Sequence, residues 1–253
     1  METAVVVAHT HDDQEEVAKN FSKYDFIAMP VVDKENRIVG IITVDDIIDV
    51  VEAENTEDVE KMAALKPSDD EYLHTSVWKL ARNRIVWLLV LMISATFTAL
   101  IIRHYEGLLT KMVFLAAFVP MLMDTCGNSG QQASTLIVRG LAVGDIELGD
   151  WLKILWKELR VGFLCALTLA VVNFLRIWIF GQADNMKVNF VVNLTLLLAV
   201  VLSKLIGCML PILAKRLKCD PALMASPLLT TSVDALTLAI YFNIATALLG
   251  VQG

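Results

Sequence analysis

A single carboxylate interrupts the last long apolar stretch of the sequence. Asp234 lies between the triplet TTS and the run ALTLAIY, within residues 227–250. A charge near the middle of a membrane costs at least ~2.5 kcal/mol on insertion scales, so it must face a partner, water or an ion. Thr230, Thr231 and Thr237 lie three or four residues away and share its helical face. The pattern predicts an ion in a wet path, and a structural hydrogen bond to a neighbouring helix is the alternative.

A second polar segment directly follows the apolar run 112–123. The sequence PMLMDTCGNSGQQAST occupies residues 120–135 and offers oxygen ligands from Asp124, Asn128, Gln131 and Gln132. Polar, glycine-containing backbone at membrane depth is tolerated only beside a cavity or inside protein. Oxygen ligands suit hard cations such as Mg2+ and Ca2+. The alternative is a helix–helix contact built on small residues.

Lys204 is the third intramembrane charge, seven residues before Pro211. We expect its side chain to snorkel toward the cytoplasmic interface, with pairing to an acid such as Asp124 as the alternative. Asp124 and Asp234 together could also form an aspartyl protease dyad. The residues around them do not fit that class, so we expect no enzyme. Since no His or Cys lies near Asp234, a hard ion is favoured over Co2+.

The distribution of charged residues divides the chain into two parts. Residues 1–74 hold 19 acids and 6 bases, a net charge of -13, whereas residues 75–253 hold 9 acids and 15 bases, a net charge of +6. Within the acidic part, five carboxylates fall in one helical stripe: Asp46, Asp49, Glu54, Glu57 and Asp58. Like charges at this spacing repel, and a divalent cation would relieve the repulsion. A plain solvated face is the alternative.

The sequence of the acidic part predicts a short α/β unit. The spacing predicts helices at residues 12–25 and 45–65 and strands at residues 26–33 and 37–44, joined by a turn at 34–36. Two strands are too few for a self-sufficient sheet. We therefore expect this unit to need a partner or to belong to a larger domain.

The basic part predicts an α-helical integral membrane protein with five transmembrane helices. The expected spans are 85–102, 112–123 with the polar run after it, 161–180, 188–213 and 227–250, with an amphipathic connector at 144–160. A span of 18 residues reaches about 27 Å, near the thickness of a bilayer core. The loops of one side carry 10 Lys and Arg and those of the other side 4. The positive-inside rule then predicts a multi-pass cell-membrane protein with a cytoplasmic N-terminus and an external C-terminus.

Three segments resemble diagnostic regions of the MgtE magnesium channels and transporters: PVVDKENRIVGIITVDDIIDVVEAENTED, PMLMDTCGNSGQQASTLIVRGLAVGDI and DPALMASPLLTTSVDALTLAIYF. The resemblance implies a homodimer with one Mg2+ pore at its interface, lined by the second and fifth spans. It implies that Asp234 holds a largely hydrated Mg2+ and that Asp220 lies at the cytoplasmic mouth. Asn128 and Thr231 complete the predicted pore set. Cys126, Gln131 and Lys204 depart from the residues usual in the family, and the positive charge of Lys204 near the pore could weaken conduction.

The same resemblance divides the chain. It implies that residues 1–53 are the second module of a cystathionine-β-synthase (CBS) pair. Residues 54–80 would be a connecting helix that plugs the pore at high Mg2+, and residues 81–253 would be the pore domain. The implied regulatory Mg2+ ligands are Glu15, Asp25, Asp46, Asp49, Glu54, Glu57 and Asp58. The family's amino-terminal helical domain and first CBS module have no counterpart in this sequence, so an ungated pore is an alternative.

Two partner expectations follow. Thr43 and Asp46 have the T-x-x-D spacing that nucleotide-binding CBS modules use, which makes ATP a candidate additional regulator. The bilayer and a second copy of the chain are the remaining expected partners, and no nucleic acid is expected.

Overall fold

The computed structural model describes residues 5–68, 72–180, 186–225 and 227–250. The chain divides into two compact units, Met1–Glu60 and Lys61–Gly253. Helix α2 (Val44–Met62) begins in the first unit, and its last two residues belong to the second. The two units are described separately below.

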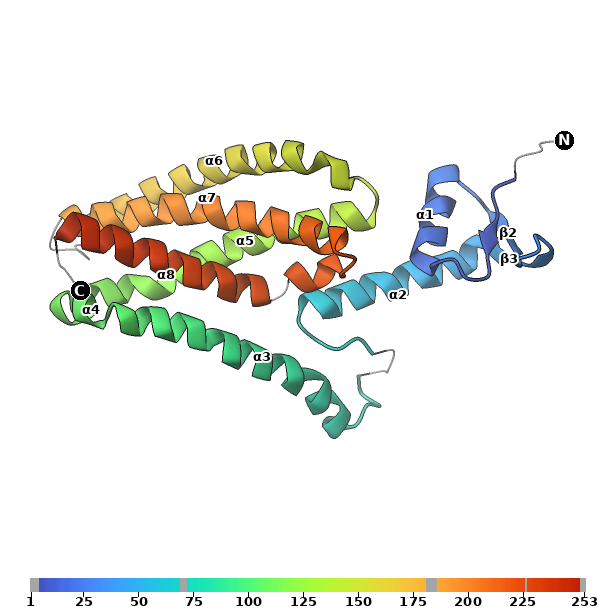
Figure 1. Cartoon of the computed structure of the whole chain (residues 1–253), viewed down its shortest axis with the longest axis horizontal. Helices are drawn as coiled ribbons and strands as arrows, with labels where there is room; N and C mark the ends of the chain where they lie inside the picture. Colours follow the sequence, from blue (N-terminus) through green and yellow to red (C-terminus); the bar gives the residue numbers. More distant parts are fainter. Residues whose placement is uncertain (1–4, 69–71, 181–185, 226, 251–253) are drawn as a thin grey trace. The chain divides into compact units, whose positions relative to one another are not determined.

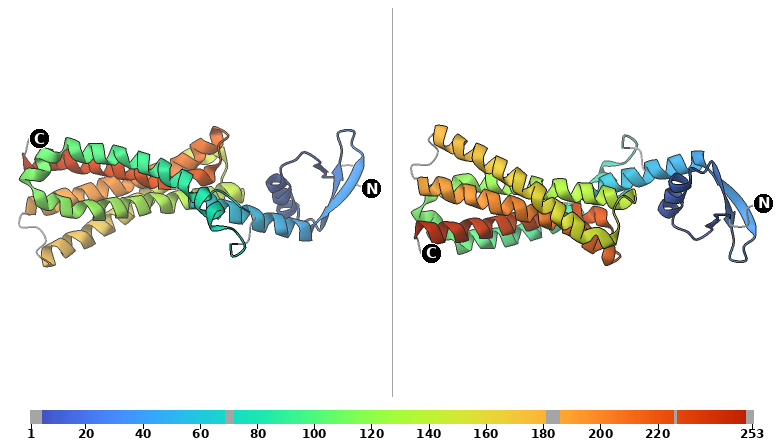
Figure 2. Two further views of the ribbon diagram at one scale, coloured as in Figure 1. Left: turned by 90° about the horizontal axis from the view of Figure 1, so that it is seen from below. Right: turned by 90° about the horizontal axis from the view of Figure 1, so that it is seen from above.

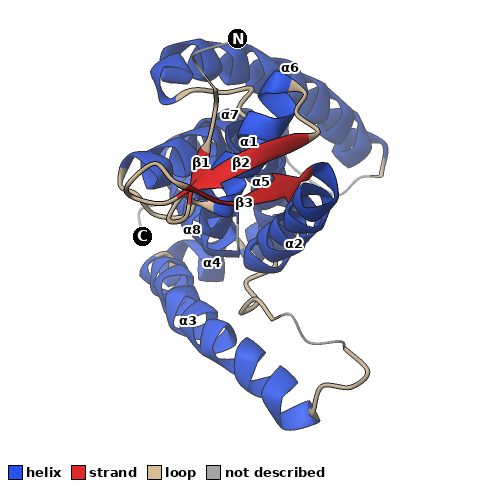
Figure 3. Cartoon of the chain, turned by 90° about the vertical axis from the view of Figure 1, so that its right-hand side faces the viewer, coloured by secondary structure: helices blue, strands red, loops and turns tan. Residues whose placement is uncertain are grey.

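The first unit contains a three-stranded sheet in the order β1-β2-β3, drawn red in Figure 3. Strand β2 (Ala28–Val32) pairs antiparallel with β3 (Ile38–Thr43), with a register shift between Val31 and Val32. Both strands were predicted. Strand β1 (Ala8–His9) pairs parallel with β2 and was not predicted, because two residues are too short to show an alternating pattern. The expectation of two strands is therefore corrected to three.

Two helices complete this unit and confirm the predicted helices. Helix α1 (Gln14–Tyr24) begins after Asp13, whose side chain accepts a hydrogen bond from Glu15 N at 2.9 Å, and ends at Asp25 in the left-handed conformation. The small core between helices and sheet is formed by Ala8, Val17, Ala18, Phe21, Met29 and Ile47.

The second unit is a bundle of long helices that run beside one another in both views of Figure 2. In chain order they are α3 (Val77–His104), α4 (Glu106–Lys111), the 3-10 turn η1 (Val113–Phe118), α5 (Val119–Ala142), η2 (Leu148–Asp150), α6 (Trp151–Ile179), α7 (Met186–Arg216), η3 (Pro221–Ala225) and α8 (Pro227–Leu249).

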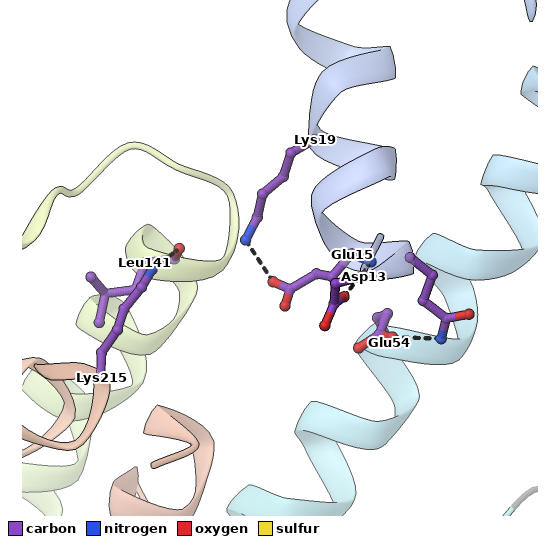
Figure 4. A network of polar contacts seen from close by, with 7 residues as sticks. Asp13, Glu15, Lys19, Glu54, Leu141 and Lys215 are labelled. Carbon is purple, nitrogen blue, oxygen red and sulfur yellow. Dashed lines mark hydrogen bonds and ion pairs between the residues drawn. The ribbon is translucent and has the colours of Figure 1, made fainter. Parts of the chain in front are cut away.

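Helix α5 packs against both α7 and α8, and this contact positions the polar residues of the bundle. Large apolar side chains from η1, α5, α7 and α8 form the core around it. The hydroxyl of Tyr241 donates to Leu115 O at 3.1 Å, and Lys215 Nζ donates to Leu141 O near the end of α5 at 3.1 Å (Figure 4). Helix α3 has no buried residue and diverges from α8 toward its amino-terminal end (Figure 1).

Four helical segments are long and apolar enough to cross a membrane: Val77–His104, Leu148–Ile179, Met186–Arg216 and Pro227–Leu249. Five spans were predicted. Helix α5 is not among the four, although its 24 residues are long enough to cross a membrane. Its polar residues from Asp124 onward lower its mean hydropathy. The structure thus supports a multi-pass membrane protein with at least these four spans.

Two predicted boundaries differ from the structure. The expected connector 144–160 is no separate element, because α6 continues through residues 160 and 161 without a break. The expected helix 54–80 is interrupted: α2 ends at Met62, Ala64 has a φ of 55°, and α3 begins only at Val77. Pro67 disfavours a helical conformation at the residue before it, which explains the stop. Residues 69–71 lie outside the described residues.

Candidate ion-binding site

Asp234 lies in the first half of α8, where its carboxylate is only partly satisfied. Its Oδ1 atom is buried and has no hydrogen-bond partner among the residues that the structure describes. The hydroxyl of Thr237, one helical turn later on the same face, is also buried, and it lies beside the thiol of Cys126 on α5, which is also close to Asp234. The expectation that no Cys lies near Asp234 is therefore wrong. An unpaired carboxylate oxygen away from water is costly. The Oδ1 atom of Asp234 therefore needs a cation, a proton or a water molecule as a partner.

The backbone of α5 approaches this carboxylate through Gly127. A Cβ atom added to Gly127 would lie 3.7 Å from Asp234 Oδ1 and only 2.8 Å from Thr230 Cγ2. Any other residue type at this position would require the side chain of Thr230 or the helix itself to shift. Glycine thus places Asp234 against the polar segment of α5, and the sequence pattern alone did not reveal this contact.

A polar stripe runs along α5 beside the Asp234 site. Asp124, Asn128, Gln131 and Thr135 follow the spacing i, i+4, i+7 and i+11, and all four are exposed in the single chain. Asn128 Nδ2 donates to Asp124 Oδ1 at 3.1 Å. At membrane depth such a stripe must face water or a polar partner, because lipid offers it no hydrogen bonds.

The predicted pore residues are only partly brought together. Thr231 donates its hydroxyl to Pro227 O, one turn earlier in α8, at 3.0 Å. Asp220 lies just before η3, where its Oδ1 atom accepts from Ala222 N at 2.8 Å and its Oδ2 atom accepts from Lys61 Nζ at 2.5 Å. No group of three or more His, Cys, Asp or Glu residues suited to a metal occurs in the described parts of the chain.

Two of the predicted regulatory acids of the first unit make separate polar contacts. Glu15 pairs with Lys19 at 2.7 Å, and Glu54 accepts from the amide of Gln14 at 2.8 Å (Figure 4). The other five are Asp25 at the end of α1 and Asp46, Asp49, Glu57 and Asp58 on α2. Within the described parts of one chain, these acids form no group of three or more around a common point that could hold a metal ion.

Thr43 and Asp46 form a helix cap at the start of α2. Asp46 Oδ2 accepts from Thr43 N at 2.9 Å and from Thr43 Oγ1 at 2.7 Å. Neither residue lines the cavity of about 400 Å3 beside β1, which His9, Asp12 and Gln14 help to line. The T-x-x-D spacing therefore has a local structural use in this chain, and its use for nucleotide binding stays a prediction.

We expect Asp46→Asn to weaken the first turn of α2 at neutral pH but not in strong acid. The hydrogen bonds from the backbone and the side chain of Thr43 lower the pKa of Asp46 below its ordinary value of 3.8. A pKa lowered by folding stabilises above the ordinary value, and this stabilisation is lost as the pH falls through the folded-state pKa. Amide exchange in this turn should therefore be faster in the variant at pH 7 and indistinguishable near pH 2.

Asp45→Asn is the matched control, since it removes a neighbouring charge from the same turn. Equal acceleration in both variants would show that the cap bonds contribute nothing beyond charge.

Lys204 lies inside the bundle and does not snorkel, so the first expectation for it is wrong. Its side chain is 5 % exposed, and Nζ lies 3.5 Å from Ser129 O on α5. Lys204 and Asp124 line one cavity of about 610 Å3, formed by α5, α6 and α7. Ser129, another lining residue, was not singled out from the sequence, and its buried hydroxyl has no partner among the described residues.

Comparison with known proteins agrees with these features. The family model described as divalent cation transporter, MgtE, matches residues 119–244, and the CBS domain model matches residues 1–53. The magnesium transporter MgtE of Thermus thermophilus is 41 % identical over 249 residues, which cover 98 % of this chain and 55 % of the relative. That of Bacillus subtilis is 39 % identical over 251 residues, 98 % of this chain and 54 % of the relative. The chain spans about half the length of the curated relatives it matches.

Proposed function

Because this chain belongs to the MgtE family of divalent cation transporters, we propose that it conducts Mg2+ across a cell membrane. The observation that carries the proposal is the buried, unpartnered Oδ1 atom of Asp234 on a membrane-spanning helix, next to Gly127 of α5. A carboxylate kept in such a place at a cost in stability is typical of an ion path.

The donors fit a hydrated hard ion. Mg2+ dehydrates reluctantly and is commonly held by one or two carboxylates plus waters. Asp234 is the one carboxylate of α8, and Asn128 supplies an amide oxygen from the α5 stripe. Thr231 can accept a hydrogen bond from a bound water while donating to Pro227 O. Few protein ligands and many waters are consistent with the lack of a metal cluster in the described single chain. Co2+ is the alternative cargo.

A homodimer would cover the polar stripe of α5. Asp124, Asn128, Gln131 and Thr135 are exposed in one chain, and a second copy would turn this stripe toward a shared, water-filled axis. Helix α5 would then be the fifth span, because its polar residues would meet water and not lipid. With five spans, the cytoplasmic N-terminus and the external C-terminus follow from the distribution of loop bases.

Gating by cytoplasmic Mg2+ rests on the acids of the first unit: Glu15, Asp25, Asp46, Asp49, Glu54, Glu57 and Asp58. In a dimer their charge is doubled, so the two copies repel until Mg2+ binds between them and shifts the population toward the approached state. Moving such an equilibrium from 1:99 to 99:1 needs about 5.5 kcal/mol of differential binding, which several weak sites together can supply. ATP would bind this same unit as a further regulator.

Residues at the end of α2 support a closing role for the segment 54–80. Lys61 Nζ contacts Asp220, the acid expected at the cytoplasmic mouth, at 2.5 Å. Met62 packs against the cluster of Val138, Ala222 and Ala225. In the approached state this segment would stay over the mouth and shut it.

Uptake of Mg2+ into proteoliposomes tests both parts of the proposal. We expect proteoliposomes with the full chain to take up Mg2+. The rate of uptake should fall as the Mg2+ concentration on the side of the first unit reaches the millimolar range. No uptake above empty liposomes would exclude the transport function. Uptake that ignores Mg2+ on that side would mean an ungated pore.

A further inference from the structure

A second polar feature lies beside the proposed ion path. The cavity of about 610 Å3 formed by α5, α6 and α7 has both an acid and a base in its wall, Asp124 and Lys204. Its other polar lining residues are Thr125, Asn128, Ser129, Gln132, Cys165 and Thr168. Asp124 and Asn128 also belong to the polar stripe of α5, so the cavity adjoins the surface that we assign to the path.

Two groups in this wall lack the partners that their burial requires. Lys204 is 5 % exposed, and in the described part of the chain the acceptor for Nζ is Ser129 O, at the long distance of 3.5 Å. Ser129 is 6 % exposed, and its Oγ atom has no hydrogen-bond partner among the described residues. An ammonium group carries three donors and is rarely buried without acceptors. A polar cavity of this size holds several waters, which would solvate both groups.

The stem of Lys204 is held in place by α6. A Cβ atom added to Gly162 would lie 3.5 Å from Lys204 Cδ and 3.7 Å from Lys204 Cβ, which is ordinary contact distance. Gly162 thus lies against the stem of Lys204, and a methyl group there would meet it at ordinary contact distance without displacing it. The stem of Lys204 therefore packs against α6, and the residue lines the same cavity as Asp124.

We propose that Lys204 is a fixed cation in the wall of the ion path, which lowers the affinity of the Asp124 side of the path for divalent cations. The inference rests on the proposed function. Conduction requires sites that bind an ion well enough to admit it and weakly enough to release it. Two acids, Asp124 and Asp234, would hold a divalent ion tightly, and the positive charge of Lys204 offsets part of that attraction. Lys204 thereby favours release of the ion.

Cys165 provides a probe of this charge that needs no transport. It lines the same cavity and is partly exposed. In the full chain carrying Cys219→Ser, which removes the exposed thiol, we would measure modification of Cys165 by anionic and cationic methanethiosulfonates of matched size. Lys204→Met should shift the ratio of the two rates about tenfold toward the cationic reagent, the size expected for a unit charge at close range. Lys204→Arg keeps the charge and should keep the ratio.

Mg2+ uptake gives the second measurement. The half-saturating Mg2+ concentration should fall about tenfold in Lys204→Met and stay near that of the wild type in Lys204→Arg. Lys204→Gln replaces Lys204→Met if the latter does not fold. An unchanged modification ratio, or failure of both reagents to reach Cys165, overturns the proposal. A shifted ratio with unchanged half-saturation also overturns it, since the charge would then not act on the path. Lack of uptake by the wild type overturns the proposed function instead, while the modification ratio still reports the charge.

Discussion

Replacing Asp234 with Asn should reduce Mg2+ uptake by about two orders of magnitude. A divalent ion held through water about 5 Å from a carboxylate gains roughly 6 kcal/mol at an effective dielectric constant of 20. If about half of this is offset by desolvation, the remaining ~3 kcal/mol corresponds to roughly 100-fold. The amide keeps the shape of the side chain and removes its charge, so the loss would report on the charge itself. Initial uptake rates in proteoliposomes are the measurement.

Folding should not suffer in this variant. Asp234 Oδ1 has no hydrogen-bond partner among the described residues, so a neutral amide removes a desolvated charge without breaking a recorded bond. We expect equal or higher thermal stability in detergent and an unchanged oligomeric state. Ser232→Ala is the control on the same helix, because Ser232 is exposed and its hydroxyl donates to Leu228 O of its own helix. Wild-type flux in Asp234→Asn would contradict the assignment of the path.

The residues of the site and their chemistry were predictable from the sequence, but the residues that they contact were not. The cost of a charge within an apolar run identified Asp234 without any knowledge of packing. Periodicity gives the face of a helix but not what that face meets. The contact between Gly127 and Thr230 and the burial of Lys204 over Gly162 therefore required the structure. Lys204 was expected to snorkel because a long side chain usually reaches the interface, whereas the structure buries it beside the cavity formed by α5, α6 and α7.

Element types in the first unit were also predictable, and element ends were less so. Both helices and two strands followed from spacing, whereas β1 has only two residues and pairs with a strand twenty residues later. The spacing predicted a helix at residues 45–65, and the family resemblance implied a connecting helix through residue 80. The left-handed conformation of Ala64 and the nearby Pro67 ended α2 at Met62. Local stop signals overrode the average propensity there.

A substitution where α5 and α7 cross should lower the stability of the protein strongly. A Cβ atom added to Gly207 would lie 2.2 Å from Gly130 O, 2.9 Å from Gly130 C and 3.1 Å from Gly130 Cα. All three atoms belong to the backbone, so no side-chain rotation relieves the overlap. Gly207→Ala must separate the two helices, and because the overlap is with backbone we expect a cost of about 3 kcal/mol, the upper end of the usual range for overpacking. This outweighs the ~1 kcal/mol that alanine gains over glycine inside a helix.

The same substitution at three glycines gives a graded test. We expect Gly207→Ala to lower the midpoint of thermal unfolding in detergent by about 5 °C or more, at the usual 2–4 °C per kcal/mol for a chain of this size. Gly130→Ala should have a smaller effect, because its added Cβ would lie 3.0 Å from Ser203 O. Gly149→Ala meets nothing within 4 Å and should leave the midpoint unchanged. Equal midpoints for all three variants would show that α5 and α7 do not approach as closely as described. Because α5 also positions Asp124 and Gly127, Gly207→Ala should reduce Mg2+ uptake even at temperatures where the protein stays folded.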